Sequence, residues 1–284
     1  MKKTASFPEQ KQSQPGKEHK MIPEPEIVKK SYKGSGKLKG KVALITGGDS
    51  GIGRSVALHF AMEGADIAIA YLEEKKDAED TKRMVKEHGV GCLLIKGDVK
   101  KEAFCKKMVS KTVETFGTLN ILVNNAAMQF PKKKPEEVDG KQVRMTFETN
   151  IFPFFYTTQE ALKYLKKGDS IINTTSVTAY RGSNHLLDYS STKGAIVSFT
   201  RSLSSMLAEK EIRVNGVAPG PIWTPLIPST FEGEDLTQFG QDTPMKRAGQ
   251  PSEVGPAYVF LASEDATYIT GQIIHINGGE IVGG

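Results

Sequence analysis

The sequence TGGDSGIG occupies residues 46–53 and directly follows the short apolar run VALI at residues 42–45. Glycine loses more backbone entropy on folding than any other residue, so glycines gathered where a strand ends imply positive φ angles or a very close approach by another group. Gly47, Gly51 and Gly53 form the pattern G-x-x-x-G-x-G. If a helix begins here, its free N–H groups and dipole favour an anion such as a phosphate. The stretch therefore predicts a strand, an anion-binding turn and a helix.

The same alternation continues along the chain from Lys41. Longer segments of helical period separate the apolar runs VALIT, DIAIAYL, CLLIKGD, LNILVNNA, SIINTTS, IRVNGVAPG and QIIHING. Nearly continuous Val, Ile and Leu are typical of strands buried on both faces of a parallel sheet. We therefore predict an α/β protein, a doubly wound Rossmann-type fold with a parallel sheet of about seven strands and helices on both faces. Helices are expected over about residues 142–165 and 189–209.

The charge is unevenly distributed. Residues 1–41 contain 11 Lys and four Glu, a net charge of +7, whereas the other 27 basic and 29 acidic residues give −2. A nearly neutral body gives no electrostatic argument for nucleic acid. The first 38 residues are rich in Lys, Pro, Gln, Glu and Ser, so they cannot bury enough apolar surface to fold alone. We expect a flexible or draped N-terminal extension at 1–38 and a single folded domain at 39–284, with a long irregular insertion at about 222–251.

Targeting, membrane and metal signals are missing from this sequence. No apolar stretch follows the basic start as in a secretory signal, and no run of 18 apolar residues is present, so we expect a cytoplasmic protein without membrane contact. Cys92 and Cys105 lack metal-ligand spacing, and reduced thiols without a chemical role are expected, with no metal site.

Several further motifs follow the glycine loop in order: NNAA at 124–127, Asn150, Ser176, Tyr189-x-x-x-Lys193, and PGPIWT at 219–224. Together with TGxxxGIG, this series resembles the short-chain dehydrogenase/reductase family in its single-domain form, over about residues 39–279. Within the family, the chain is most similar to bacterial members with a Lys- and Pro-rich N-terminal extension, described as stress proteins or aldehyde reductases.

The spacing of Tyr189 and Lys193 places both on one face of a helix. A nearby ammonium stabilises a phenolate, so we expect Lys193 to lower the pKa of Tyr189, which then carries a proton as general acid or base. Ser176 ends an apolar strand, where its hydroxyl is expected to donate to a substrate carbonyl. The resemblance implies a fourth catalytic residue, Asn150, which holds a water that passes protons through Lys193. These residues imply interconversion of an alcohol and an aldehyde or ketone by hydride transfer.

The resemblance also implies where the cofactor, NAD or NADP, binds. Lys193 is expected to hold the nicotinamide ribose hydroxyls near Tyr189. The expected cofactor-binding residues are Gly47, Ser50, Gly51, Ile52, Gly53, Tyr71, Leu72, Asp98, Val99, Asn125, Ala126, Ala127, Tyr189, Lys193, Pro219, Gly220, Ile222 and Thr224.

The choice between NAD and NADP is not marked by the usual residues. In the family, an Asp at the position of Tyr71 marks NAD, and a basic residue at position 50 or 72 marks NADP, but this chain has Ser50 and Leu72. Glu73 and Glu74 oppose a 2′-phosphate, while Lys75 and Lys76 favour one. We lean slightly to NAD.

Substrate contacts are expected from Gln129, Val177 and Trp223. A loop residue, Arg181, is a further candidate for binding an anionic substrate, although a surface residue without that role is favoured. The insertion at 222–241 is expected to be partly disordered without ligand and to close over the cofactor. In similar proteins the last helix and strand build a two-fold interface, so we expect a homotetramer.

Three other functions remain open for this sequence. An enoyl reductase is disfavoured because related enzymes space Tyr and Lys seven residues apart, not four. A catalytically silent cofactor sensor usually lacks the Tyr or Lys. For a structural stress factor acting through the basic extension, deletion of residues 1–38 would leave turnover unchanged but abolish protection.

Overall fold

In the computed structural model, residues 6–283 are described, and they build one seven-stranded parallel sheet. The strand order is β3-β2-β1-β4-β5-β6-β7, and every neighbouring pair runs parallel. The strands are β1 (Val42–Thr46), β2 (Asp66–Tyr71), β3 (Cys92–Lys96), β4 (Ile121–Asn124), β5 (Ser170–Thr174), β6 (Arg213–Pro219) and β7 (Ile273–Ile276). This confirms the predicted doubly wound fold.

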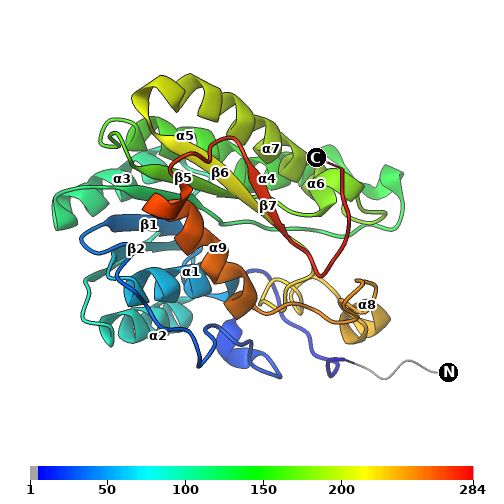
Figure 1. Cartoon of the computed structure of the whole chain (residues 1–284). Helices are drawn as coiled ribbons and strands as arrows, with labels where there is room; N and C mark the ends of the chain where they lie inside the picture. Colours follow the sequence, from blue (N-terminus) through cyan, green and yellow to red (C-terminus); the bar gives the residue numbers. More distant parts are fainter. Residues whose placement is uncertain (1–5, 284) are drawn as a thin grey trace.

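Helices cover both faces of the sheet (Figure 1). On one face, α1 packs against α9 and α2; on the other, α3 packs against α5, and α4 against α7. The helices are α1 (Gly51–Met62), α2 (Lys75–Lys86), α3 (Glu102–Phe116), α4 (Gly140–Asn150), α5 (Phe152–Ala161), α6 (Thr178–Arg181), α7 (Leu187–Leu207), α8 (Gly233–Thr237) and α9 (Pro251–Ala262). Short 3-10 turns lie at η1 (Glu18–Lys20), η2 (Pro135–Glu137), η3 (Ala208–Lys210) and η4 (Glu264–Ala266).

Two apolar layers, one on each side of the sheet, make the core. Alternate residues of β1 belong to different layers: Ala43 and Ile45 pack with α1 and α9, whereas Leu44 packs with α3 and α5. All five residues of β1 are buried, as a strand covered on both faces requires.

The predicted helix over 142–165 is divided in two. Chain direction changes at Ile151 (φ −132°, ψ −43°), between α4 and α5. Pro153 lies in the first turn of α5 and has no N–H to donate to the preceding turn, so it cannot continue α4.

The described part of the extension, residues 6–38, lies against the body of the protein at many points. Its residues Phe7 and Met21 are buried in a cluster with Trp223, Phe231 and Leu236 of the insertion. The insertion itself is short of regular structure and contains α8. Within residues 6–283, the helices lack the combination of length and apolar character that crossing a membrane requires.

Candidate active site

A cavity of about 1180 Å³ opens at the carboxyl edge of the sheet. It lies where the strand order reverses between β1 and β4, the position at which open α/β sheets bind ligands. Its volume suits a ligand larger than most drug-sized molecules. The predicted residues that line it are Gly47, Ser50, Gly51, Ile52, Tyr71, Leu72, Asp98, Val99, Asn125, Ala126, Ala127, Gln129, Ser176, Val177, Tyr189, Lys193, Pro219, Gly220, Ile222 and Thr224.

Thr46 and Asn125 join the two strands at this reversal. The Thr46 hydroxyl accepts hydrogen bonds from the backbone N–H groups of Asn125 (2.9 Å) and Ala126 (3.1 Å). The Asn125 amide donates to the carbonyls of Thr46 (3.1 Å) and Gly47 (3.3 Å). The NNAA segment therefore fixes the glycine loop from the side, in addition to lining the cavity.

The glycines of the loop have distinct tasks. Gly47 and Gly51 have φ angles of +64° and +53°, which favour glycine. Gly53 has a different constraint, because a Cβ there would lie 1.9 Å from the Gly47 carbonyl oxygen. Gly53 does not line the cavity, so its expected contact with the cofactor is replaced by a packing role between loop and helix.

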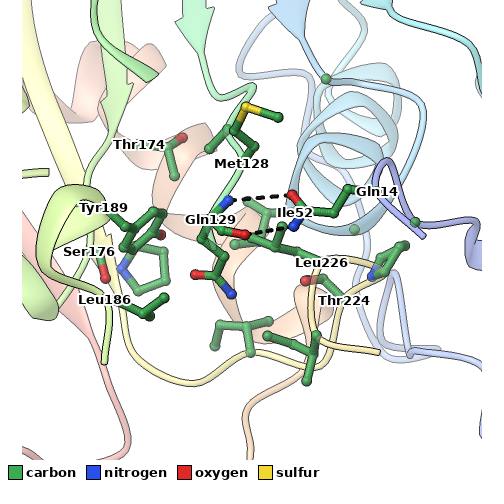
Figure 2. A pocket seen from close by; sticks show the side chains of 18 of the residues that line it. Gln14, Ile52, Met128, Gln129, Thr174, Ser176, Leu186, Tyr189, Thr224 and Leu226 are labelled. Atoms are coloured by element: carbon green, nitrogen blue, oxygen red, sulfur yellow. Dashed lines mark hydrogen bonds between the residues drawn. The ribbon is translucent and has the colours of Figure 1, made fainter. Parts of the chain in front are cut away.

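Three predicted catalytic side chains line the same cavity, and Figure 2 shows two of them, Ser176 and Tyr189, side by side. Ser176 follows β5, while Tyr189 and Lys193 come from the first two turns of α7. Ser176 Oγ accepts from the backbone N–H (3.2 Å) and hydroxyl (3.1 Å) of Thr178, which leaves its own proton free to donate. Lys193 Nζ donates to the Thr174 carbonyl at 3.0 Å and lies 5.3 Å from the centre of the Tyr189 ring.

Burial shifts both titrating groups towards their neutral forms. Desolvation raises the pKa of Tyr189 to about 12, although a hydrogen bond with Ser176 acts in the opposite direction. Desolvation also lowers the pKa of Lys193 to about 7. The prediction that Lys193 lowers the pKa of Tyr189 is thus wrong for the protein without cofactor. Burial of the phenol raises this pKa, and the effect outweighs any attraction from the Lys193 amine, which is itself partly neutral.

Asn150 is near these groups but does not line the cavity. Its Oδ1 accepts from the Met128 N–H, and its Nδ2 donates to the Met128 carbonyl (both 2.9 Å) and to the Thr192 hydroxyl (3.2 Å). The Asn150 side chain therefore braces the loop after β4 against α7, and its expected role in holding a water stays a prediction.

Trp223 is not a substrate contact, contrary to the prediction. Its side chain is fully buried and outside the cavity lining. The indole stacks on Phe7 with a 3.7 Å centroid distance, and its Nε1 donates to the Pro23 carbonyl at 2.9 Å. An aromatic residue in an insertion can equally well pack against the extension, and only the tertiary structure reveals that partner.

Carboxyl groups line the end of the cavity beside Tyr71 and Leu72, namely Asp49, Glu73 and Glu74. Asp49 is buried, and desolvation together with the nearby Glu74 charge raises its pKa to about 7. Sequence reasoning considered Glu73 and Glu74 but missed Asp49, whose place inside the glycine motif was the available signal.

Three residues of the extension, Gln14, Pro15 and Gly16, also line the cavity. Figure 2 shows Gln14 reaching across to Gln129, opposite Ser176 and Tyr189. The sequence contains only a weak signal for this approach, namely apolar residues such as Phe7 and Met21 scattered through a mainly polar extension. Within residues 6–283, no group of three His, Cys, Asp or Glu side chains has a metal-binding arrangement.

Comparison with known proteins gives the class of this chain. A family model described as "Enoyl-(Acyl carrier protein) reductase" matches residues 47–280. General stress protein 39 of Bacillus subtilis is 56% identical over 97% of each chain. The glucose and ribitol dehydrogenase of Daucus carota is 53% identical over 98% of each chain. The chloroplastic NADPH-dependent aldehyde reductase 1 of Arabidopsis thaliana is 52% identical over 98% of this chain and 99% of that protein.

Solved structures agree with these relatives. A Burkholderia cenocepacia short-chain dehydrogenase in complex with NADP superposes with a TM-score of 0.81, at 27% identity, over 86% of this chain and 98% of that one. A short-chain dehydrogenase/reductase described as glucose/ribitol dehydrogenase from Brucella melitensis has a TM-score of 0.76 and 33% identity, over 89% of this chain and 100% of that one. The chain belongs to the short-chain dehydrogenase/reductase family of oxidoreductases, as its motifs predicted.

These comparisons support a nicotinamide cofactor and alter one expectation about it. The slight lean to NAD is not supported, because a structural neighbour holds NADP and a relative is named for NADPH. The finding favours NADP instead.

Proposed function

We propose that this protein interconverts an alcohol and an aldehyde or ketone, with Tyr189 as the proton donor or acceptor. The observation that carries this proposal is a single cavity that contains both the glycine loop and the Ser176, Tyr189 and Lys193 side chains. The bound nicotinamide would supply or accept the hydride. The chain's own groups would then need only to hold the carbonyl and move one proton.

Ser176 and Tyr189 are suited to bind the same oxygen atom. Two donors from Thr178 orient the Ser176 hydroxyl, and a hydrogen bond already connects Ser176 to Tyr189. A carbonyl oxygen between them would accept from both hydroxyls, which polarises the carbonyl and places the Tyr189 proton for transfer. Lys193, with a pKa near neutrality, is the group next to Tyr189 that can replace this proton.

The substrate that fits best is a small, neutral, polar carbonyl compound. Arg181 lines the cavity, but its Nε lies 3.2 Å from a Glu280 carboxylate oxygen, which offsets its charge. Gln129 and His185 offer polar groups beside the apolar Leu186. Relatives named aldehyde reductase and glucose and ribitol dehydrogenase support small aldehydes and sugars as the first compounds to test.

We infer NADP(H) as the cofactor to expect, on the support of the NADP-named neighbours. The carboxyl groups of Asp49 and Glu74 would repel a 2′-phosphate when ionised. Because burial raises the pKa of Asp49 to about 7, much of this group is protonated near neutral pH. NADPH binding should therefore weaken as the pH rises above 7.

The deciding experiment compares the wild type with Tyr189→Phe. NADPH and NADH fluorescence titrations are followed by a panel of aldehydes, ketones and sugars. We expect the variant to bind cofactor within about twofold of wild type and to lose on the order of 10²–10⁴-fold in turnover, because only the proton donor is removed. Tyr180→Phe is the matched control, since Tyr180 OH has no hydrogen-bond partner within residues 6–283 and does not line the cavity. Equal turnover in Tyr189→Phe and wild type would contradict the assignment.

Enoyl reduction is the second candidate, because the matching family model carries that description. The four-residue spacing of Tyr189 and Lys193 disfavours it. Adding a short enoyl thioester to the panel tests it directly. Faster reduction of the enoyl thioester than of any aldehyde, ketone or sugar would replace the proposed reaction. Tight cofactor binding without turnover of any compound would favour the cofactor-sensing alternative.

A further inference from the structure

The N-terminal extension contacts the segments that surround the cavity. Residues 6–16 lie along the insertion, η1 lies beside α2, and Gln14, Pro15 and Gly16 line the cavity itself. Gly16 packs tightly against the insertion, since a Cβ there would lie 2.1 Å from the Pro225 carbonyl oxygen. The extension thus touches the insertion, the glycine loop and the loop after β4.

Gln14 binds the loop after β4 through both ends of its amide (Figure 2). Its Nε2 donates to the Gln129 carbonyl at 2.6 Å, and its Oε1 accepts from the Gln129 N–H at 3.4 Å. The Gln129 side chain is buried at 4% exposure in the wall that faces Tyr189 and Leu186. The position of Gln129 is consequently fixed by a residue more than 100 positions away in the sequence.

The first described residues hold the insertion. The backbone N–H groups of Ser6 (2.7 Å) and Phe7 (3.3 Å) donate to the Thr237 carbonyl at the end of α8, and Gln12 N–H donates to the Pro228 carbonyl at 2.8 Å. Phe7 is only 8% exposed because its ring stacks on Trp223. Tyr189 belongs to the same apolar cluster as Phe7 and Trp223, so the extension reaches the packing around the proposed proton carrier.

Glu18 attaches the extension to the start of α1. Its carboxylate accepts from the Gly51 N–H at 2.5 Å and forms a buried ion pair with Arg54. Asp77 of α2 accepts from the backbone N–H groups of Glu18 (2.9 Å) and His19 (3.2 Å). The Glu18 carboxyl group satisfies a free donor at a helix N-terminus, which fixes the extension beside the glycine loop.

We propose that residues 14–16 of the extension are part of the active site, where they form one wall of the cavity, and that Ser6, Phe7 and Gln12 hold the insertion in place. Gln14 is then a positioning residue: through Gln129 it sets the shape of the substrate end. The KM test of this inference rests on the proposed function, because it needs a substrate that the enzyme turns over. The hydrogen-exchange test does not. The inference also argues against the structural stress factor, in which the extension would act independently of turnover.

The test compares Gln14→Ala with Gln10→Ala in the full-length protein. The Gln10 side-chain amide likewise forms two hydrogen bonds with the backbone of one residue, the N–H and carbonyl of Ile22. Gln10 and Ile22 both lie in the extension and do not line the cavity. We expect Gln14→Ala to raise the KM for the best substrate of the panel about tenfold with a small change in kcat, since two hydrogen bonds to Gln129 are lost. Gln10→Ala should leave KM unchanged.

A second readout does not depend on turnover. Hydrogen exchange of residues 222–241 is measured without cofactor in wild type, Phe7→Ala and Gln10→Ala. We expect faster exchange in Phe7→Ala only, because the stacking on Trp223 is lost. Identical exchange in all three proteins, with an unchanged KM in Gln14→Ala, would overturn the proposal. If no compound is turned over by wild type, the proposed reaction fails, while the exchange result still decides the role of the extension.

Discussion

At the scale of single residues, the candidate site is governed by burial. Tyr189 and Lys193 are both almost completely buried, and the two pKa shifts have opposite directions because desolvation favours the neutral form of each group. The spacing of the two residues predicted that they share a helix face. The degree of burial that sets their charges is a tertiary property, so the sequence led to the wrong direction for Tyr189.

Lys193 should make the stability of the protein without cofactor depend on pH. Its pKa is about 7 when folded and about 10.5 when unfolded, so the unfolded chain binds more protons between these values and stability rises with pH across that range. From pH 7 to 9 this contributes about 2 kcal/mol to the free energy of unfolding. Denaturant unfolding of wild type and Lys193→Met measures the effect, which should be missing in the variant. Parallel pH dependences would contradict the shifted pKa.

The charge of Asp49 should control the affinity for a cofactor that carries a 2′-phosphate. In Asp49→Asn, we expect the affinity for NADPH at pH 8 to increase on the order of tenfold, because a buried negative charge in the cavity wall is removed. The weakening of NADPH binding between pH 6 and 8 should also become smaller. NADH, which lacks that phosphate, is the internal control, and an equal gain in NADH affinity would show that charge repulsion is not the cause.

At the scale of elements, the motif TGGDSGIG does what its composition predicted, namely end β1 and begin α1. It was possible to predict this because glycine spacing and the flanking apolar runs are local signals. The division between α4 and α5 was missed even though Pro153 marked it. The apolar periodicity continues through the break, so the pattern alone suggested one helix.

Gly53 permits a direct test of how tightly the loop and helix pack. Gly53→Ala places a methyl group 1.9 Å from the Gly47 carbonyl oxygen, so we expect a loss of about 1–3 kcal/mol in stability and much weaker cofactor binding. Gly194→Ala, a glycine of α7 with open space around its Cβ position, should be neutral or slightly stabilising. Thermal melts and NADPH titrations of both variants provide the comparison. Wild-type behaviour of Gly53→Ala would refute the packing role.

At the scale of the whole molecule, apolar side chains remain exposed on helices away from the cavity. Phe152 and Phe155 of α5 are 41% and 54% exposed, and Met206 of α7 is 75% exposed. Exposed apolar groups on neighbouring helices are typical of an interface between copies of a chain. We therefore retain the homotetramer as a prediction.

Light scattering coupled to size-exclusion chromatography tests this assembly. The wild type should have four times the 31.0 kDa mass of one chain, and Phe155→Glu should reduce the mass by placing a charge in the interface. Lys111→Glu changes the charge at an exposed position of α3 and should leave the mass unchanged. A wild-type mass of 31 kDa would exclude the tetramer.

The sequence by itself determined the strands of the sheet, the order of the motifs along the chain, and the family. Strand periodicity, glycine spacing and the Tyr189–Lys193 interval are all local in the chain. Only the tertiary structure decided that Trp223 binds Phe7, that Asn150 braces a loop, and that Gln14 enters the cavity. Each of these depends on two segments far apart in sequence, whose meeting is set by packing around the whole sheet and leaves no periodic signal in either segment.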